Sequence, residues 1–110
     1  MKDVFCQIVE GQIPSKKVYE DDDILAIEDI KPKARIHVVI FPKKHLSATI
    51  NEEDSDVILE KVFKTVRKIA KDKKVDQTGY RVLSNHGFDA GQSVSHLHFH
   101  LLAGEQLKDI

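Results

Sequence analysis

The 110-residue chain predicts a single domain in which five short strands combine with two helices. Two observations support this mixed fold. Five segments of four to eight residues are rich in β-branched or alternating apolar residues, which is typical of strands. One segment of about twenty residues, and a shorter one near the amino terminus, instead carry apolar residues at helical spacing. No internal repeat, low-complexity tract or linker divides residues 1–110, so one domain is expected.

A short helix and a hairpin are predicted first along the chain. Val4 to Val9 has the apolar spacing of a short amphipathic helix, which Gly11 ends. Lys17 to Glu20 and Ile24 to Glu28 are predicted to be strands that pair as a hairpin across a turn of three aspartates. The proline in residues 29–33 disfavours regular structure, so this segment is expected to form a loop.

A buried strand and the long helix follow. Ile36 to Phe41 is rich in β-branched residues and is predicted to be a strand buried on both faces, which Pro42 stops. Asn51 is the predicted N-cap of a helix over Glu52 to Lys73, whose first turn is acidic. The apolar stripe of this helix is expected to face the core and comprises Leu59, Val62, Phe63, Val66, Ile69 and Ala70.

The last two strands are predicted at Tyr80 to Ser84 and at Ser95 to Leu102, on either side of a glycine-containing loop. The final strand holds three histidines at strict two-residue spacing between large apolar residues. Because successive side chains of a strand point to opposite faces, His96, His98 and His100 are expected to share one face. The leucine and phenylalanine side chains between them are expected to pack on the other face.

The composition excludes several classes of protein. Lys and Arg number 17 and Asp and Glu 18, so the net charge of −1 gives no electrostatic case for nucleic acid or membrane binding. Cys6 is the only cysteine, which rules out a disulfide within the chain. No apolar stretch is long enough for a signal-peptide core or a membrane span. We therefore expect a soluble cytoplasmic protein.

The histidine row has three interpretations. It could be the polar outer face of a half-buried strand, but serine or threonine would serve equally well there. It could hold a zinc ion, since imidazoles at alternate strand positions can point at one metal. It could also perform chemistry on phosphorus, which the preceding segment Gly91-Gln92-Ser93-Val94 favours because its backbone N–H groups and hydroxyl can hold phosphate oxygens.

Two enzyme classes are disfavoured by missing motifs. A serine hydrolase is set aside because no second glycine follows Ser93 to complete a Gly-x-Ser-x-Gly elbow. An oxidoreductase is disfavoured because the sequence has no Gly-x-Gly-x-x-Gly motif.

The segment His96-Leu97-His98-Phe99-His100-Leu101-Leu102 fits the pattern His-φ-His-φ-His-φ-φ, with φ apolar, at every position. Further matches follow in order along nearly the whole chain: Phe5 with Ile8, Ile13-Pro14, Asp29-Ile30, Pro32, His37, residues 40–45, residues 79–81, Asn85 and residues 91–94. On these residues the sequence resembles the Hint branch of the histidine-triad family. The resemblance implies an α+β, HIT-like fold with a five-stranded antiparallel sheet, one long helix and one short helix. It also implies a homodimer in which the two sheets join.

The resemblance further implies an enzyme that needs no cofactor. Members of this branch act on the α-phosphate of purine nucleotides of the AMP or GMP type, typically by cleaving the P–N bond of a nucleoside 5′-phosphoramidate such as adenosine monophosphoramidate. His98 is implied to be the nucleophile, which forms a nucleotidyl-histidine intermediate. His100 and Ser93 are implied to hold the phosphate, and His96 completes the catalytic row.

Positions that match the nucleotide pocket of the family are spread along the chain. Asp29 is implied to accept hydrogen bonds from both ribose hydroxyls. The phosphate site is implied to include His37, Asn85, Gly91, Gln92 and the N–H of Val94. The apolar slot for the purine ring is implied to include Phe5, Ile8, Ile13 and Ile30.

The resemblance also raises the question of a metal. Some bacterial relatives bind a structural zinc through two N-terminal cysteines, the histidine matched by His45 and the first triad histidine, here His96. In this chain Cys6 keeps one cysteine position and Asp3 stands at the other. A set with one thiolate and one carboxylate is weaker for zinc than one with two thiolates, so no bound zinc is expected.

Two other functions remain open at this point. The first is a dinucleoside polyphosphate hydrolase of a neighbouring branch, against which His100 argues because that branch usually has glutamine there. The second is a nucleotide-binding scaffold protein with little turnover, which no sequence feature excludes.

Overall fold

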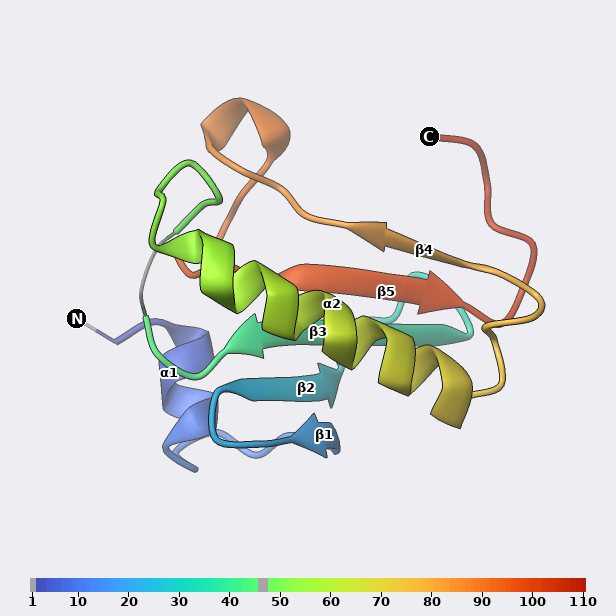
Figure 1. Ribbon diagram of the computed structural model, residues 1–110, viewed down its shortest axis with the longest axis horizontal. Helices are drawn as coiled ribbons and strands as arrows, with labels where there is room; N and C mark the ends of the chain where they lie inside the picture. The colour runs from blue at the N-terminus through green and yellow to red at the C-terminus, as the bar shows by residue number, and fades with distance from the viewer. Residues whose placement is uncertain (1, 46–47) are drawn as a thin grey trace.

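The computed structural model describes residues 2–45 and 48–110 and contains one five-stranded antiparallel sheet with a helix on each face (Figure 1). The strands lie in the order β1-β2-β3-β5-β4. They span Lys17–Glu20 (β1), Ile24–Glu28 (β2), Ile36–Pro42 (β3), Tyr80–Leu83 (β4) and Phe99–Ala103 (β5). The helices are Val4–Val9 (α1), Ser55–Asp72 (α2) and a single 3₁₀ turn at Phe88–Ala90 (η1). The predicted α+β fold is confirmed.

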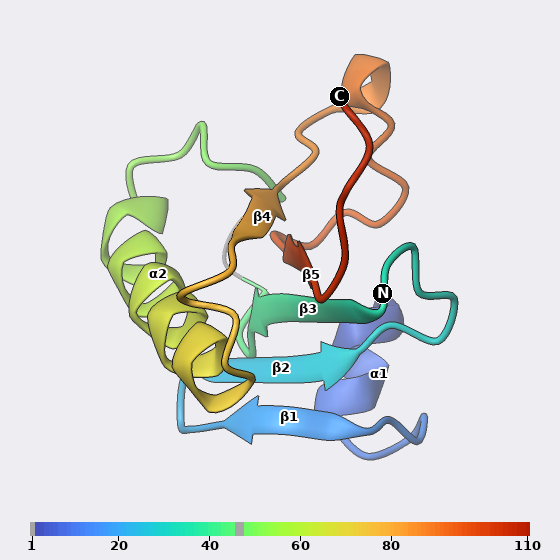
Figure 2. The same cartoon turned by 90° about the vertical axis from the view of Figure 1, so that its right-hand side faces the viewer.

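The two helices cover opposite faces of the sheet, as Figure 2 shows. On one face, apolar residues of α2 such as Val62 and Ile69 pack against Val38, Ile40 and other alternate strand residues. On the other face, the α1 residues Phe5 and Ile8 pack with Leu25, Ile27, Val39 and Phe41. Neighbouring residues of β2 and β3 therefore enter two different cores, which explains why these strands carry continuous apolar runs.

The pairing of β3 with β5 places the functional side chains on the α1 face. Val39 is opposite His100 and His37 is opposite Leu102 in this antiparallel ladder. Paired residues point to the same face of a sheet, and Val39 belongs to the core beneath α1. His37 and His100 therefore share that face, in the interior of the sheet, with β4 as the outer strand beyond β5.

Two predicted boundaries and one predicted core position are wrong. The long helix starts at Ser55 after Asp54, rather than at Glu52 after Asn51, because residues 50–54 form turns. The last strand starts at Phe99 rather than Ser95, because the chain bends at residues 94–96. Phe63 lies at the margin of the apolar stripe, where its ring contacts Phe99 but stays 46% exposed. In the part of the chain that the structure describes, no helix is both long and apolar enough to cross a membrane.

Candidate active site

His98 is held in a single orientation by the main chain just before β5. Its Nδ1 lies 2.7 Å from the carbonyl oxygen of His96, so Nδ1 carries the proton and donates to that oxygen. The lone pair of a neutral His98 is then on Nε2. The side chain is buried, and its ring lies 4.9 Å from the ring of Phe5. Burial lowers the pKa of His98 below its usual value, although the hydrogen bond to the His96 carbonyl opposes this effect, so the ring stays neutral at pH 7.

A chain of hydrogen bonds fixes the proton of His100 as well. The backbone N–H of Lys33 donates to Nδ1 of His37 at 3.0 Å, so the proton of a neutral His37 is on Nε2. That Nε2 donates to Nδ1 of His100 at 2.9 Å. His100 must therefore carry its own proton on Nε2. His98 and His100 thus have complementary roles, since one presents a lone pair at Nε2 and the other an N–H.

His37 and His100, the two histidines joined by this hydrogen bond, are both neutral at physiological pH. Burial, together with the neighbouring His98 and His37, lowers the pKa of His100 to about 4. Burial also lowers the pKa of His37, although Asp29, whose carboxylate lies 3.5 Å from its Nε2, opposes this. The rings of His98 and His100 meet edge to face with centroids 5.3 Å apart.

A cavity of about 300 Å³ opens beside His100. Asp29 lines this cavity. Its Oδ1 accepts a hydrogen bond from the backbone N–H of Lys31 at 2.8 Å, and this side-chain turn fixes the orientation of the carboxylate. The cavity brings three other predicted site residues together with Asp29, namely His37, Asn85 and His100. Its walls also contain four residues that the sequence did not single out: Lys31, Lys33, Leu83 and Leu102.

The loop before the histidines has a fixed backbone and an exposed hydroxyl. Gly91 has a φ of +79°, a left-handed conformation that favours glycine. The side chain of Gln92 is used within the protein, since it accepts from the N–H of Gly87 and donates to the carbonyls of Ala48 and Val94. The exposed Ser93 hydroxyl has no hydrogen-bond partner among residues 2–45 and 48–110. Gln92 is thus a loop-ordering residue, while Ser93 is available to a ligand.

The sequence model of the HIT domain matches residues 10–107. The chain belongs to the HIT family.

Solved structures of HIT proteins support this assignment over nearly the whole chain. A histidine triad protein from Clostridium difficile has a TM-score of 0.92 and 46% identity, covering 97% of this chain and 94% of that one. A HIT family hydrolase from Legionella pneumophila has a TM-score of 0.91 and 39% identity, covering 97% and 96%. A histidine triad nucleotide-binding protein from Candida albicans has a TM-score of 0.82 and 34% identity, covering 99% and 85%.

The apolar residues expected at the purine slot of this HIT protein have very different exposure. Phe5 and Ile8 are buried, and the ring of Phe5 stacks on Phe41 at 4.5 Å. Ile13 packs partly buried against the same core. Ile30 is 89% exposed at the loop after β2, next to Asp29. Ile30 is therefore apolar surface open to a ligand, whereas Phe5 and Ile8 also stabilise the fold.

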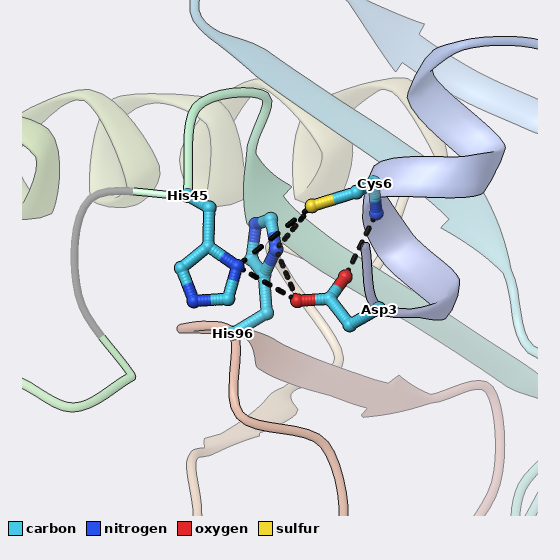
Figure 3. A group of neighbouring side chains, drawn as sticks. All are labelled: Asp3, Cys6, His45 and His96. Carbon is cyan, nitrogen blue, oxygen red and sulfur yellow. Dashed lines mark hydrogen bonds and ion pairs between the residues drawn. The ribbon is translucent and has the colours of Figure 1, made fainter. Parts of the chain in front are cut away.

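The first triad histidine faces a different group of side chains. His96 is fully buried, and its Nε2 donates to the carbonyl of Pro42 at 2.7 Å. Its Nδ1 lies 3.1 Å from Oδ2 of Asp3 and 3.7 Å from the sulfur of Cys6. His45 completes the cluster, with its Nδ1 2.9 Å from the same Asp3 oxygen and 3.7 Å from the same sulfur (Figure 3).

The four side chains of this cluster fit a tetrahedral zinc ion. One atom from each residue lies within 4.8 Å of all the others. A tetrahedral zinc with bonds of about 2.0–2.3 Å separates its ligand atoms by about 3.3–3.7 Å, and the two sulfur–nitrogen distances of 3.7 Å agree with this. The oxygen–nitrogen distances of 2.9 and 3.1 Å are slightly shorter. Burial and Asp3 raise the pKa of the Cys6 thiol, so without a cation Cys6 is protonated.

Proposed function

We propose that this HIT protein is a purine nucleoside 5′-phosphoramidase of the Hint type, which cleaves the P–N bond through a nucleotidyl-histidine intermediate on His98. The observation that carries the proposal is the 2.7 Å hydrogen bond from Nδ1 of His98 to the carbonyl of His96. It leaves an unprotonated Nε2 on a buried, neutral imidazole, which can attack phosphorus without a separate base.

The first step joins Nε2 of His98 to the α-phosphorus and breaks the bond to the leaving amine. Negative charge on the phosphate oxygens is stabilised by the Nε2–H of His100 and by the N–H of Val94. The amine must gain a proton as it leaves, and the exposed Ser93 hydroxyl would relay this proton from solvent. Water then attacks phosphorus, a P–O bond forms as the bond to Nε2 of His98 breaks, and one proton of the water passes to solvent; the nucleoside monophosphate is released and Nε2 regains its lone pair.

The rest of the nucleotide is assigned to the residues around this centre. Asp29 would accept hydrogen bonds from the ribose hydroxyls, since it lines the cavity and its Oδ2 lies 3.5 Å from Nε2 of His37. Ile30 would cover the purine together with the margin of the core at Phe5 and Ile8. Asn85 lines the same cavity, while Gly91 and Gln92 hold the phosphate loop in shape.

The same proposal includes a homodimer built through β4 and α2. β4 is an outer strand of the sheet, and strand edges of this kind pair readily with another chain. Beside it lies an apolar groove of about 510 Å³ in which Phe63 is 46% and Tyr80 39% exposed. A second copy would bury both rings and extend the sheet across the two subunits.

The decisive experiment is a rapid quench with adenosine 5′-phosphoramidate, followed by intact mass measurement. Wild-type protein is expected to show an adenylyl adduct that is absent from His98→Ala and His98→Gly. Unchanged hydrolysis by His98→Ala would refute the mechanism. Tight AMP binding without turnover by the wild type would favour the nucleotide-binding scaffold, and faster turnover of a diadenosine polyphosphate would favour the neighbouring branch.

A further inference from the structure

We propose that Ser84 is a positioning residue for His98, because its hydroxyl gives the main chain of this histidine a hydrogen bond that the sheet no longer provides at that point. The hydroxyl lies 2.6 Å from the carbonyl oxygen of His98 and donates to it. The sequence predicted Ser84 only as the last residue of a strand. The role of this bond in catalysis rests on the proposed function, whereas its role in holding His98 does not.

The ladders of the sheet stop just short of His98. The last pair between β4 and β5 is Leu83 opposite His100. The last pair between β3 and β5 is Ile40 opposite Phe99. Among the described residues, these two registers give His98 no opposite partner. The proposed nucleophile is therefore carried by a segment that lies between the preceding bend and the start of β5, outside the regular sheet.

Ser84 occupies the corresponding point on the neighbouring strand. It is the first residue after β4, where that strand also leaves the ladder, and it is half-buried. In a continuing antiparallel ladder a main-chain N–H would donate to the carbonyl of His98. Serine hydroxyls form such short-range bonds to main-chain groups in place of regular pairing. The side chain of Ser84 thus ties His98 to the end of β4 after the ladder between the two strands has ended.

Two hydrogen bonds together hold the nucleophile at two points. The ring is held through Nδ1, which donates to the carbonyl of His96 at 2.7 Å. The main chain is held by Ser84, since the direction of the His98 carbonyl fixes the ψ angle of that residue. Because β5 begins at the next residue, this angle determines where the ring is presented relative to the sheet. The loss of the Ser84 bond should therefore loosen the ring while its bond to His96 stays intact.

The geometry of attack makes this position important for the rate. Nucleophile and phosphorus must approach to about 3–3.5 Å in line, and a misplacement of about 1 Å can slow a reaction about 100-fold. One of two anchoring bonds is lost without Ser84, so we expect a smaller effect, about tenfold. Ser84 is not among the described residues that line the cavity beside His100, so the affinity for nucleotide should change little.

The experiment compares wild type with Ser84→Ala, which removes the donor, and Ser84→Thr, which keeps it. Val75→Ala is the stability control, because Val75 is buried in the core beneath α2 and its truncation lowers the thermal midpoint without touching His98. The rate of adduct formation with adenosine 5′-phosphoramidate is measured in a single turnover, together with the dissociation constant for AMP. NMR of the free protein gives the carbonyl carbon resonance of His98, which reports the Ser84 bond, and the relaxation of its ring.

We expect Ser84→Ala to form the adduct about tenfold more slowly than wild type, with little change in the dissociation constant for AMP. The carbonyl resonance of His98 should shift and its ring should become more mobile. Ser84→Thr should restore the rate, the resonance and the relaxation. Val75→Ala should lose stability without slowing adduct formation.

Three results would overturn the proposal. The first is adduct formation by Ser84→Ala at the wild-type rate. The second is an equal loss of rate in Val75→Ala, which would show that lower stability alone slows the reaction. The third is a slow Ser84→Thr in which the carbonyl resonance of His98 is at its wild-type position, because the bond would then be present without effect. If the wild type forms no adduct and has no turnover, the proposed function fails; unchanged ring relaxation of His98 in Ser84→Ala would then overturn this inference as well.

Discussion

Nε2 of His37 lies 2.9 Å from Nδ1 of His100, which makes a residue of β3 the determinant of the proton position on a triad histidine of β5. The direction of this bond is set one step earlier, because the N–H of Lys33 donates to Nδ1 of His37. The antiparallel register of β3 and β5 brings the two rings together. A loop amide thus controls, through His37, which ring nitrogen of His100 carries the proton and can donate a hydrogen bond.

His37→Ala is predicted to lower kcat/KM about five- to tenfold, as expected for the loss of one orienting hydrogen bond worth about 1–1.5 kcal/mol. The acid limb of the pH profile should also move to higher pH, because Nδ1 of His100 becomes free to accept a proton. His37→Gln keeps an N–H donor and should recover most of the rate and the original pH profile. A rate loss in both variants with unchanged pH profiles would assign His37 a purely structural role.

Activity is predicted to persist well below pH 6.5. The pKa values of His37, His98 and His100 are all lowered by burial, that of His100 to about 4, and the mechanism uses their neutral forms. The rate kcat/KM should therefore stay nearly constant from pH 8 to below 6.5, the usual pKa of histidine, and the contribution of neutral His100 should be lost as the pH approaches 4. An acid limb centred at 6.5 would show that the triad titrates like exposed histidine.

The same lowered pKa values predict the pH dependence of stability. Between pH 6.5 and about 4 the unfolded chain binds a proton at His100 and the folded chain does not, and the lowered pKa values of His37 and His98 act in the same direction below pH 6.5. The free energy of unfolding must then decrease as the pH falls through this range. Urea unfolding at pH 7 and pH 5 measures the change, and His100→Gln should make it smaller. A protein that is more stable at pH 5 than at pH 7, with the same difference in His100→Gln, would contradict this account.

The sequence could predict which side chains share a face, but not where the last strand begins. Alternation predicted that Leu97 and Phe99 share one face and His98 the opposite one; in the structure the first two lie in the core beneath α2, and the ring of His98 lies beside Phe5. An extended chain keeps this alternation even where it has no ladder partner. The backbone N–H of His96 bonds to the carbonyl of Val94, so the chain bends there and pairing starts only at Phe99.

The start of the long helix was decided by tertiary contacts. Asn51 and Asp54 are both residue types that favour an N-cap, so the local sequence does not distinguish them. Ser55 is completely buried, and its hydroxyl donates to the carbonyl of Thr49 at 3.1 Å, which anchors the helix start at that point. The cluster around His96 is a similar case, because the distances among Asp3, Cys6 and His96 depend on how α1 docks on the sheet.

Phe63→Asp is predicted to convert a dimer into a monomer. Its ring is 46% exposed in the groove beside β4, and an aspartate there would replace apolar contact area by a carboxylate that loses its hydration in the proposed interface. Val57→Asp is the matched control, since Val57 is on the same helix and 67% exposed but does not line the groove. Light scattering after size exclusion should give a dimer for wild type and Val57→Asp and a monomer for Phe63→Asp. A wild-type monomer at micromolar concentration would refute the proposed dimer.

Asp29→Asn is predicted to raise KM for adenosine 5′-phosphoramidate at least tenfold and to change kcat little. The carboxylate would accept two hydrogen bonds from the ribose in ground state and transition state alike, so its loss weakens binding rather than the chemical step. The matched control is the 2′,3′-dideoxy substrate, which lacks both hydroxyls. Wild type and Asp29→Asn should have similar KM values on that substrate. Because Asp29 also lies 3.5 Å from Nε2 of His37, the pH profile must be measured in parallel. A shifted acid limb together with an equal KM increase on both substrates would mean that Asp29 acts through His37 and not on the ribose.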